Sequence, residues 1–179
     1  MAIEDAPPLA NAAETKPNFS KGVIELGDLT DKNVGQLKLI NQASFPVNYN
    51  SSFYDDLQRN LSLAKLAYFN DVMVGAVCTR LETVERTPKL YIMTLGVLSA
   101  YRRLGIGSLL IKHVLEEICK EQSQVASVYL HVQTSNEAAI EFYKKFGFEI
   151  KGVIEHYYKH IEPPNCYIVE RKNDFYTGK

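Results

Sequence analysis

The chain of 179 residues has no tryptophan, few cysteines and no apolar run long enough to span a bilayer. Its three cysteines, Cys78, Cys119 and Cys166, are odd in number and form no C-x-x-C pair. This spacing argues against a disulfide framework and against a structural zinc site, and it favours a reducing compartment. We therefore expect no metal in this protein.

An excess of charge of either sign is also missing. The chain has 20 basic and 21 acidic residues and a net charge of −1, so no global basic field indicates a nucleic-acid partner. Residues 1–20 lack the basic and apolar regions of a secretory signal, and their acids argue against an organelle transit peptide. We predict a disordered extension over residues 1–20, one domain over 21–172 and a tail over 173–179.

Hydrophobic periodicity predicts a mixed α/β domain. Strands are expected at residues 23–26, 63–69, 72–81, 89–98, 127–133, 148–150 and 166–171. Helices are expected at residues 34–43, 51–61, 105–120 and 136–147.

Several turn and cap residues mark the ends of these elements. Thr30 is a candidate N-cap for the first helix, and Ser51 or Ser52 for the second. The Asn70-Asp71 dipeptide between two strand patterns predicts a hairpin. Gly147 is placed as the glycine that follows a helix C-terminus.

The stretch "YRRLGIG" lies where a strand leads into an amphipathic helix. Glycines at a helix N-terminus let the backbone approach a ligand, and the free N–H groups there attract anions such as phosphate. The adjacent Arg102 and Arg103 would strengthen such a site. The stretch matches neither a P-loop nor a Rossmann fingerprint. The alternative is a plain strand-to-helix turn with two solvated arginines.

These residues resemble a known family. The pattern R-x-x-G-x-G at residues 102–107 resembles the acetyl-CoA signature of the GNAT acetyltransferases, in which backbone amides hold the pyrophosphate of coenzyme A. The segment "NEAAIEFYKKFGF" resembles the helix of that fold beside the thiol arm of the cofactor. Its matching residues are Asn136, Ala139, Tyr143, Gly147 and Phe148.

A closer resemblance links the chain to the catalytic subunits of NatE-type N-terminal acetyltransferases. It covers roughly residues 22–172 and rests on the segments "FPVNYN", "LAKLAYFND", "VGAVC", "LYIMTLGVL", "YRRLGIG", "YLHVQTSNEAAIEFYKKFGFEI" and "YYKHIEP". The N-terminal extension, the "ETVERTPK" loop and the tail lie outside it or diverge. The resemblance implies a GNAT fold and acetyl transfer from acetyl-CoA to protein N-termini. It also implies the NatA complex at the ribosome as a partner, and a cytoplasmic location with the nucleus as a second one.

The resemblance assigns catalysis to Tyr91 and His131, which would act with an ordered water to deprotonate the amine. Histidine is poised near neutral pH, whereas tyrosine is a poor free base and a better proton carrier. The ordinary alternatives are a core or edge histidine and a packing tyrosine. The cofactor-binding residues implied are Leu95, Val97, Arg102, Arg103, Gly105, Gly107, Ser108, Asn136 and Tyr143.

Two loops and one strand residue are expected to form the acceptor site. Apolar side chains would bind a methionine followed by a hydrophobic or amphipathic residue, and tyrosine hydroxyls would bond the peptide backbone. The residues implied are Phe45, Pro46, Val47, Tyr49, Met93, Tyr157, Tyr158 and Ile161. The alternative is that they are ordinary loop and core aromatics.

Three other functions compete with this one. The acceptor could be a lysine side chain or a polyamine, although no carboxylates cluster near the acceptor loops, as a polyamine site would require. The chain could instead be a largely non-catalytic partner subunit, against which the intact Tyr91 and His131 argue. An acyl-cysteine at Cys78 is disfavoured because no histidine lies near it in sequence, so we interpret Cys78 as a small buried hydrophobe.

Overall fold

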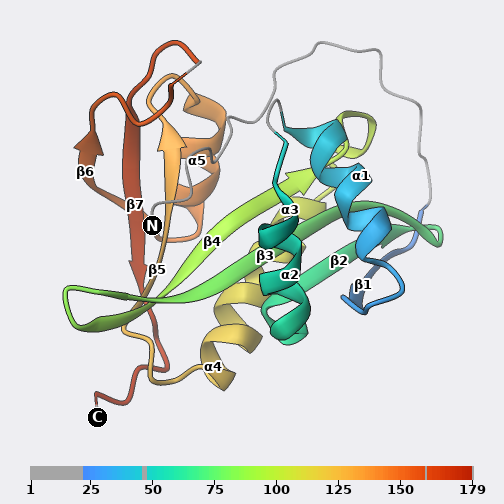
Figure 1. Ribbon diagram of the computed structural model, residues 1–179, viewed down its shortest axis with the longest axis horizontal. Helices are drawn as coiled ribbons and strands as arrows, with labels where there is room; N and C mark the ends of the chain where they lie inside the picture. The colour runs from blue at the N-terminus through green and yellow to red at the C-terminus, as the bar shows by residue number, and fades with distance from the viewer. Residues whose placement is uncertain (1–21, 46–47, 160, 179) are drawn as a thin grey trace.

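The computed structural model describes residues 22–45, 48–159 and 161–178, and its centre is a seven-stranded sheet of order β1-β2-β3-β4-β5-β7-β6 (Figure 1). Its strands are β1 (Ile24–Asp28), β2 (Ala64–Phe69), β3 (Val72–Val84), β4 (Thr87–Val97), β5 (Ser127–Gln133), β6 (Glu149–Ile154) and β7 (Cys166–Lys172). Neighbours run antiparallel except β4 and β5, which are parallel.

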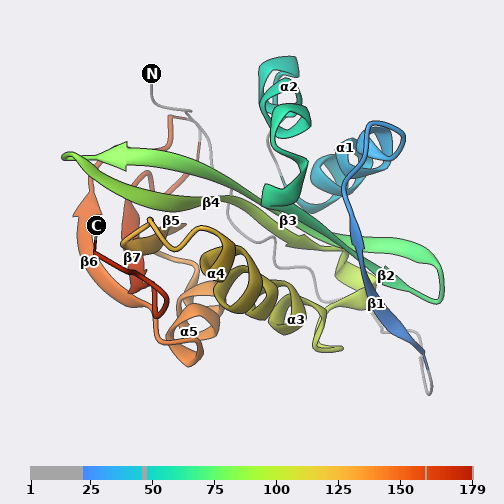
Figure 2. The same cartoon turned by 90° about the horizontal axis from the view of Figure 1, so that it is seen from below.

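Helices cover both faces of this sheet. Figure 2 shows α1 (Val34–Ser44) and α2 (Ser51–Arg59) on one side, and α3 (Ile106–His113), α4 (Cys119–Glu121) and α5 (Glu137–Lys145) on the other. The π-helical segment η3 (Val114–Ile118) joins α3 to α4, and the short 3₁₀ turns η1 (Leu61–Leu63) and η2 (Ser99–Tyr101) precede β2 and α3. The expected helix over residues 105–120 is therefore nearly continuous.

The core lies on both sides of the central strands. Leu66, Val77 and Leu90 on the sheet and Leu110 and Ile111 on α3 are fully buried. An α-helix buries one stripe at 3- and 4-residue spacing, which explains why α3 keeps Leu109 toward solvent. This packing fixes α3, and with it the turn that precedes α3, against the sheet.

Two hairpins order the first half of the sheet. Asn70 and Asp71 have φ values of 47° and 65°, which is the left-handed pair that a two-residue hairpin needs, so this predicted turn is confirmed. Glu85 and Arg86 have φ values of 49° and 67° and form a second such turn. The prediction of a loop over "ETVERTPK" is wrong, because β3 and β4 stay paired up to Val84 and Thr87 and only a two-residue turn separates them.

The cap predictions were partly wrong. Asn33, rather than Thr30, precedes α1, and its Oδ1 accepts from the Thr30 N–H at 2.8 Å. Asn50, rather than Ser51 or Ser52, caps α2, and its Oδ1 accepts from the Phe53 N–H at 3.1 Å.

The structure also corrects the end of α2, while one C-terminal cap stands as predicted. The α2 helix ends at Arg59 and not at Leu61. Gly147 follows the α5 C-cap with φ +77°, as predicted.

The strands β4 and β5 diverge after a short parallel stretch. They pair at three positions, of which Tyr91 with Tyr129 is the last. The β3–β4 register then shifts around Met93, which inserts one extra residue into β4 and bends it. Meanwhile β5 stays paired with β7 along its whole length. A V-shaped opening between β4 and β5 results.

The residues after β7 are tied to the domain. The side-chain amide of Asn173, which is 2% exposed, donates to the carbonyl oxygens of Cys119 at 3.2 Å and Val125 at 2.9 Å. The Thr177 N–H donates to the Ser123 carbonyl oxygen. Across the described parts of the chain, no helix has the length and apolar character needed to cross a membrane.

Candidate active site

A cavity of about 40 Å³ lies in the opening between β4 and β5. Residues of both strands, of the α1–α2 connection and of α5 line it: Phe45, Ile92, Met93, Thr94, Leu95, Leu130, His131, Val132, Gln133, Asn136, Ala139 and Tyr143. The edge of β4 beyond Tyr91 therefore faces this cavity instead of β5. The predicted residues Phe45, Met93, Leu95, His131, Asn136 and Tyr143 meet here.

The glycine turn lies at the N-terminus of α3. Gly105 precedes the helix at φ +86°, where an L-residue would be strained, and its carbonyl oxygen accepts from the Leu109 N–H at 3.0 Å. The N–H groups of residues 106–108 belong to the first turn and have no acceptor within the helix. A Cβ at Gly107 would lie 3.6 Å from Phe142 and 3.8 Å from the Leu95 side chain. The turn is thus close to the predicted cofactor residue Leu95.

The two arginines have different places. Arg102 Nε donates to the carbonyl oxygen of Val97 at 2.9 Å, and partial burial lowers the pKa of its guanidinium. Arg103 is exposed and sits at φ +67°. Arg102 therefore braces the turn between β4 and α3, while Arg103 presents its charge to solvent. Ser108 lies half-buried in the first turn of α3.

The predicted residues of α5 lie on the cavity side of that helix. Asn136 caps α5, and its Oδ1 accepts from the Ala139 N–H at 3.1 Å. Tyr143 is 5% exposed, and burial raises its pKa well above the ordinary tyrosine value. Its hydroxyl therefore remains protonated and able to donate.

The proposed catalytic pair is brought into contact. The Tyr91 hydroxyl lies 3.1 Å from His131 Nδ1, and the Tyr157 hydroxyl lies 3.3 Å from the same nitrogen. The His131 and Tyr157 rings are 4.7 Å apart between centroids. The three side chains come from β4, from β5 and from the β6–β7 connection, so they meet only in the folded chain.

Burial sets the protonation of this group. It lowers the pKa of His131, an effect that the negative charge of Glu82 opposes. It raises the pKa of Tyr91 well above 10, with Tyr157, Tyr129 and Glu82 adding to the rise. At neutral pH the imidazole is therefore a neutral base and the phenol a protonated donor.

Sequence reasoning missed the groups behind Tyr91. Tyr129, on β5, donates its hydroxyl to Glu82 Oε2 and lies 4.9 Å from Tyr91 between ring centroids. Glu82 is paired with Arg80, whose guanidinium lies 5.7 Å from the Tyr91 ring centre. One signal could have found Tyr129: it lies two residues before His131 in a strand, and so on the same face.

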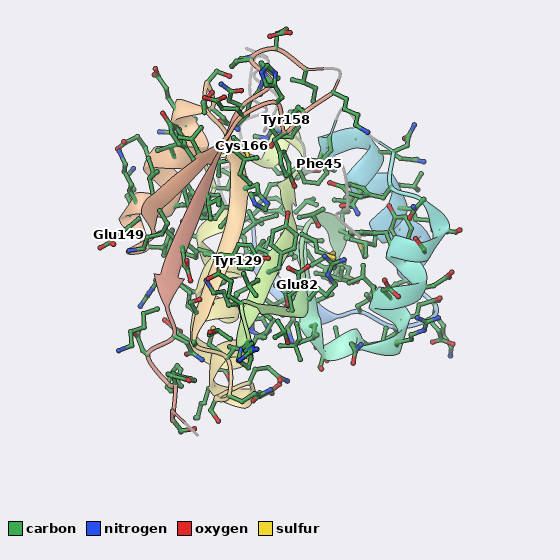
Figure 3. All side chains as sticks on the ribbon, turned by 60° about the vertical axis from the view of Figure 1, so that its left-hand side comes forward. Phe45, Glu82, Tyr129, Glu149, Tyr158 and Cys166 are labelled. Carbon is green, nitrogen blue, oxygen red and sulfur yellow. The ribbon has the colours of Figure 1, made fainter. Side chains whose placement is uncertain are left out.

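Aromatic contacts link several of the predicted acceptor residues. Phe45 is buried, and its ring centroid lies 6.2 Å from that of Tyr49. The Tyr49 ring in turn stacks on the Phe53 ring, with 4.4 Å between centroids. Tyr158 is 2% exposed and contacts the Tyr157 ring edge-on at 5.0 Å. Figure 3 places Phe45 and Tyr158 toward the same end of the molecule.

Three further predicted acceptor residues are Ile161, Pro46 and Val47. Ile161 is half-buried, whereas Pro46 and Val47 lie outside the described residues. Tyr49 borders a second cavity between α1 and α2, together with Lys38, Gln42, Ser51 and Tyr54.

The cysteines take no part in the site. All three are buried thiols, and burial raises the pKa of Cys78 to about 12. A thiol so far from ionisation is a poor nucleophile, in agreement with its interpretation as a buried hydrophobe. Within the described ranges, no group of three or more His, Cys, Asp or Glu side chains could hold a metal.

Comparison with known proteins identifies the fold family. The protein-family model described as "Acetyltransferase (GNAT) family" matches residues 35–148 of the sequence, which is well over half of the chain. The chain belongs to this family. The expected GNAT fold, with a mixed and mostly antiparallel sheet flanked by helices, is confirmed.

Two relatives share half or more of the aligned residues. N-alpha-acetyltransferase 50 of Danio rerio is 54% identical over 151 residues, which cover 84% of this chain and 89% of that protein. Probable N-acetyltransferase san of Drosophila melanogaster is 50% identical over 153 residues, covering 86% of this chain and 83% of that protein. The resemblance to NatE-type catalytic subunits is thereby confirmed.

One solved structure is similar in both sequence and shape. It is Arabidopsis thaliana Naa50 in complex with the bisubstrate analogue CoA-Ac-MVNAL, with a TM-score of 0.75 and 51% identity. The match covers 83% of this chain and 97% of that chain.

Proposed function

We propose that this acetyl-CoA-dependent N-alpha-acetyltransferase acts on protein N-termini that begin with methionine followed by a hydrophobic residue. The observation that carries the proposal is the contact of Tyr91 and His131 beside a cavity walled by Phe45 and Met93. Base and apolar wall share one opening, so an N-terminal residue could be bound and deprotonated at the same place. The Arabidopsis relative was solved with an analogue whose peptide part reads MVNAL, which supports a methionine-first acceptor.

The residues of the opening fit the acyl donor. Bound acetyl-CoA supplies an acetyl group activated as a thioester. The first-turn amides of α3, at Ile106, Gly107 and Ser108, would hold its pyrophosphate, with Arg103 adding positive charge. Leu95 and Tyr143 would border the thiol arm, since both line the cavity. The cradle fits because Gly107 has no Cβ between the helix amides and Leu95.

His131 and Tyr91 would move the proton of the acceptor amine. An α-amine has a pKa of about 7.7–8.0, against about 10.4 for lysine, so its neutral form is easier to generate. The neutral imidazole of His131 accepts the proton at Nδ1, and the Tyr91 hydroxyl, 3.1 Å away, relays it. Tyr157 touches the same nitrogen and would help to orient the amine.

The acceptor preference follows from apolar burial. Phe45 and Met93 are buried apolar side chains at the cavity, and the Tyr157–Tyr158 pair lies on the neighbouring loop. Burying a methionine side chain is worth about 1.5–3 kcal/mol, or roughly ten- to a hundredfold in affinity.

A peptide library varied at its first two positions tests this preference. We expect Met-Leu and similar N-termini to give the highest kcat/KM, and acidic or small first residues the lowest. A library in which Ser- or Ala-initiated peptides dominate would contradict the proposal.

We also propose that the protein works in the cytoplasm, with the nucleus as a second location, as a partner of a NatA-type complex at the ribosome. This proposal rests on the family resemblance of the sequence alone. Sedimentation of the tagged protein with ribosomes, abolished when the NatA-type complex is depleted, would support it. Unchanged sedimentation after depletion would contradict the partner.

A further inference from the structure

A bridge of side chains crosses β4 at the point where β4 and β5 separate. Glu82 on β3 accepts from the Tyr129 hydroxyl on β5, so the contact spans the strand between them. Tyr91 on that middle strand pairs in register with Arg80 on one side and Tyr129 on the other. Figure 3 shows Glu82 and Tyr129 close together near the middle of the molecule.

The bridge encloses the ring of Tyr91. The Arg80 guanidinium lies 5.7 Å from the Tyr91 ring centre, and the Tyr129 ring centre lies 4.9 Å from it. Glu82 bonds both flanking groups: Arg80 Nε donates to Glu82 Oε1 at 2.9 Å, and Tyr129 donates to Oε2. The Glu82 side chain is 24% exposed, which is low enough for its bonds to persist and for its charge to act at short range.

We propose that Glu82 is a positioning residue for amine deprotonation: it holds Arg80 and Tyr129 against the Tyr91 ring and so fixes the Tyr91 hydroxyl at His131. This inference deepens the proposed function and rests on the roles given there to Tyr91 and His131. Glu82 does not touch the reacting atoms. It acts through the two side chains that it bonds, at the last paired residue before the opening.

The charge of Glu82 also acts on the base. Among the residues that the structure describes, the groups that act on His131 are Tyr91 from β4, Tyr129 from its own strand β5, Tyr157 from the β6–β7 connection, and Glu82 from β3, which is paired with Arg80. Burial lowers the pKa of His131, and the charge of Glu82 opposes this effect. Loss of the charge would therefore lower the pKa of His131 further, and the acidic limb of the pH–rate profile would move to lower pH.

Isosteric variants test the proposal on the full chain. For Glu82→Gln we expect a fall in kcat of about tenfold, an unchanged KM for acetyl-CoA and an acidic limb displaced to lower pH. For Tyr129→Phe, which keeps the charge, we expect a smaller fall in kcat and no displacement. Because both act through one bond, the double variant should lose little more than Glu82→Gln alone.

The matched control is Glu149→Gln. Glu149 makes an exposed ion pair with Lys151 at 2.6 Å on β6 (Figure 3), away from Glu82, so this variant should keep wild-type kinetics. An unchanged kcat in Glu82→Gln would overturn the proposal. So would a fall in kcat and in thermal stability with the acidic limb unmoved, which would indicate a structural role alone.

His131→Ala separates this inference from the proposed function. If His131→Ala retains wild-type turnover of a Met-Leu peptide, the catalytic roles themselves fail. If His131→Ala is inactive while Glu82→Gln behaves as wild type, only the positioning role fails.

Discussion

At the scale of single residues, burial is the main cause of the pKa shifts in the proposed catalytic pair. The same withdrawal from water lowers the pKa of His131 and raises that of Tyr91, because in each case it disfavours the charged form. The two groups therefore stand as neutral acceptor and neutral donor 3.1 Å apart. An exposed histidine, with an ordinary pKa of about 6.5, would be partly protonated near neutral pH and so a less complete proton acceptor.

Removing either group should slow turnover without loosening the cofactor. We expect Tyr91→Phe and His131→Ala each to lower kcat by roughly a hundredfold, since general acid–base catalysis contributes on this order. Acetyl-CoA affinity, measured by calorimetry, should stay near wild type. A double variant whose barrier rises by the sum of the single effects would contradict a shared relay.

The pH profile of the wild-type enzyme follows from the same shift. A base must be deprotonated to act, so kcat rises with pH through the pKa of His131. Because burial lowers that pKa, the acidic limb should lie below the ordinary histidine value of about 6.5. Steady-state kinetics between pH 5 and 8 would check this, and a limb centred above the ordinary value would count against His131 as the base.

A side chain at Gly107 should block the cofactor. A Cβ there would meet Phe142 and Leu95 at ordinary contact distances, so the fold should survive, but the branches of valine would enter the space beside the helix amides. We expect Gly107→Val to weaken acetyl-CoA binding at least about tenfold in calorimetry. The control is Gly35→Val on α1, where a Cβ meets nothing within 4 Å. Unchanged affinity in a folded Gly107→Val would refute the role of this turn.

At the scale of elements, β4 and β5 are paired over a short parallel stretch and separate beyond it, where the cavity lies. Lys89 Nζ on β4 and the Ser127 hydroxyl on β5 both bond Glu170 Oε1 on β7, the former at 2.8 Å. Burial alone would raise the pKa of Glu170, but its bonds to Lys89 and Ser127 lower it below the ordinary value. The carboxylate therefore ties three strands together along the short stretch where β4 and β5 are paired, before the opening begins.

This clamp should appear in the stability of the protein. We expect Glu170→Ala to lower the free energy of unfolding by about 1–3 kcal/mol, because Lys89 and Ser127 lose a shared acceptor. A pKa depressed by folding stabilises the protein above the unfolded value and is lost as pH falls through the folded one, so Glu170→Ala should flatten the acid dependence below about pH 4.5. Denaturant unfolding at several pH values would show this. A loss no larger than that of the exposed-pair variant Glu141→Ala would contradict it.

The second hairpin offers a gain of stability. Arg86 lies at φ +67°, where glycine is unstrained, so Arg86→Gly should stabilise the protein by roughly 0.5 kcal/mol after the entropy of the unfolded chain is deducted. Thr83→Gly, in the paired part of β3, should destabilise it. Calorimetry would decide, and a lower Tm for Arg86→Gly would be the contrary result.

At the scale of the whole molecule, the sequence predicts most elements and fewer of their contacts. Periodicity placed the strands and helices because a two-sided sheet buries a recognisable stripe from each. The Asn70-Asp71 turn was predicted since its residues tolerate φ > 0, whereas Glu85-Arg86 carries no such signal. The bend at Met93 and the early end of β4–β5 pairing arise from tertiary packing, which no local pattern encodes.

The candidate site, like the fold, was predicted from the sequence only in part. Local chemistry singled out the glycine turn as a possible anion site, and the family resemblance added its cofactor and the pair Tyr91–His131, which the structure brings together. Glu82 was missed because it lies in a stretch expected to be a loop, although it pairs in β3. The double contact of Tyr157 and Tyr91 with one nitrogen required knowing how the β6–β7 connection folds.

The most direct test of the account is competition for acetyl transfer at neutral pH between a Met-Leu peptide, a Ser-initiated peptide and an N-terminally blocked peptide with an internal lysine. An apolar wall at Phe45 and Met93 beside a neutral His131 predicts that the Met-Leu peptide is acetylated fastest, and that Phe45→Ala reduces this preference. If the blocked lysine peptide is acetylated fastest, or if Phe45→Ala leaves the methionine preference unchanged, the assignment of this opening to N-terminal methionine is wrong.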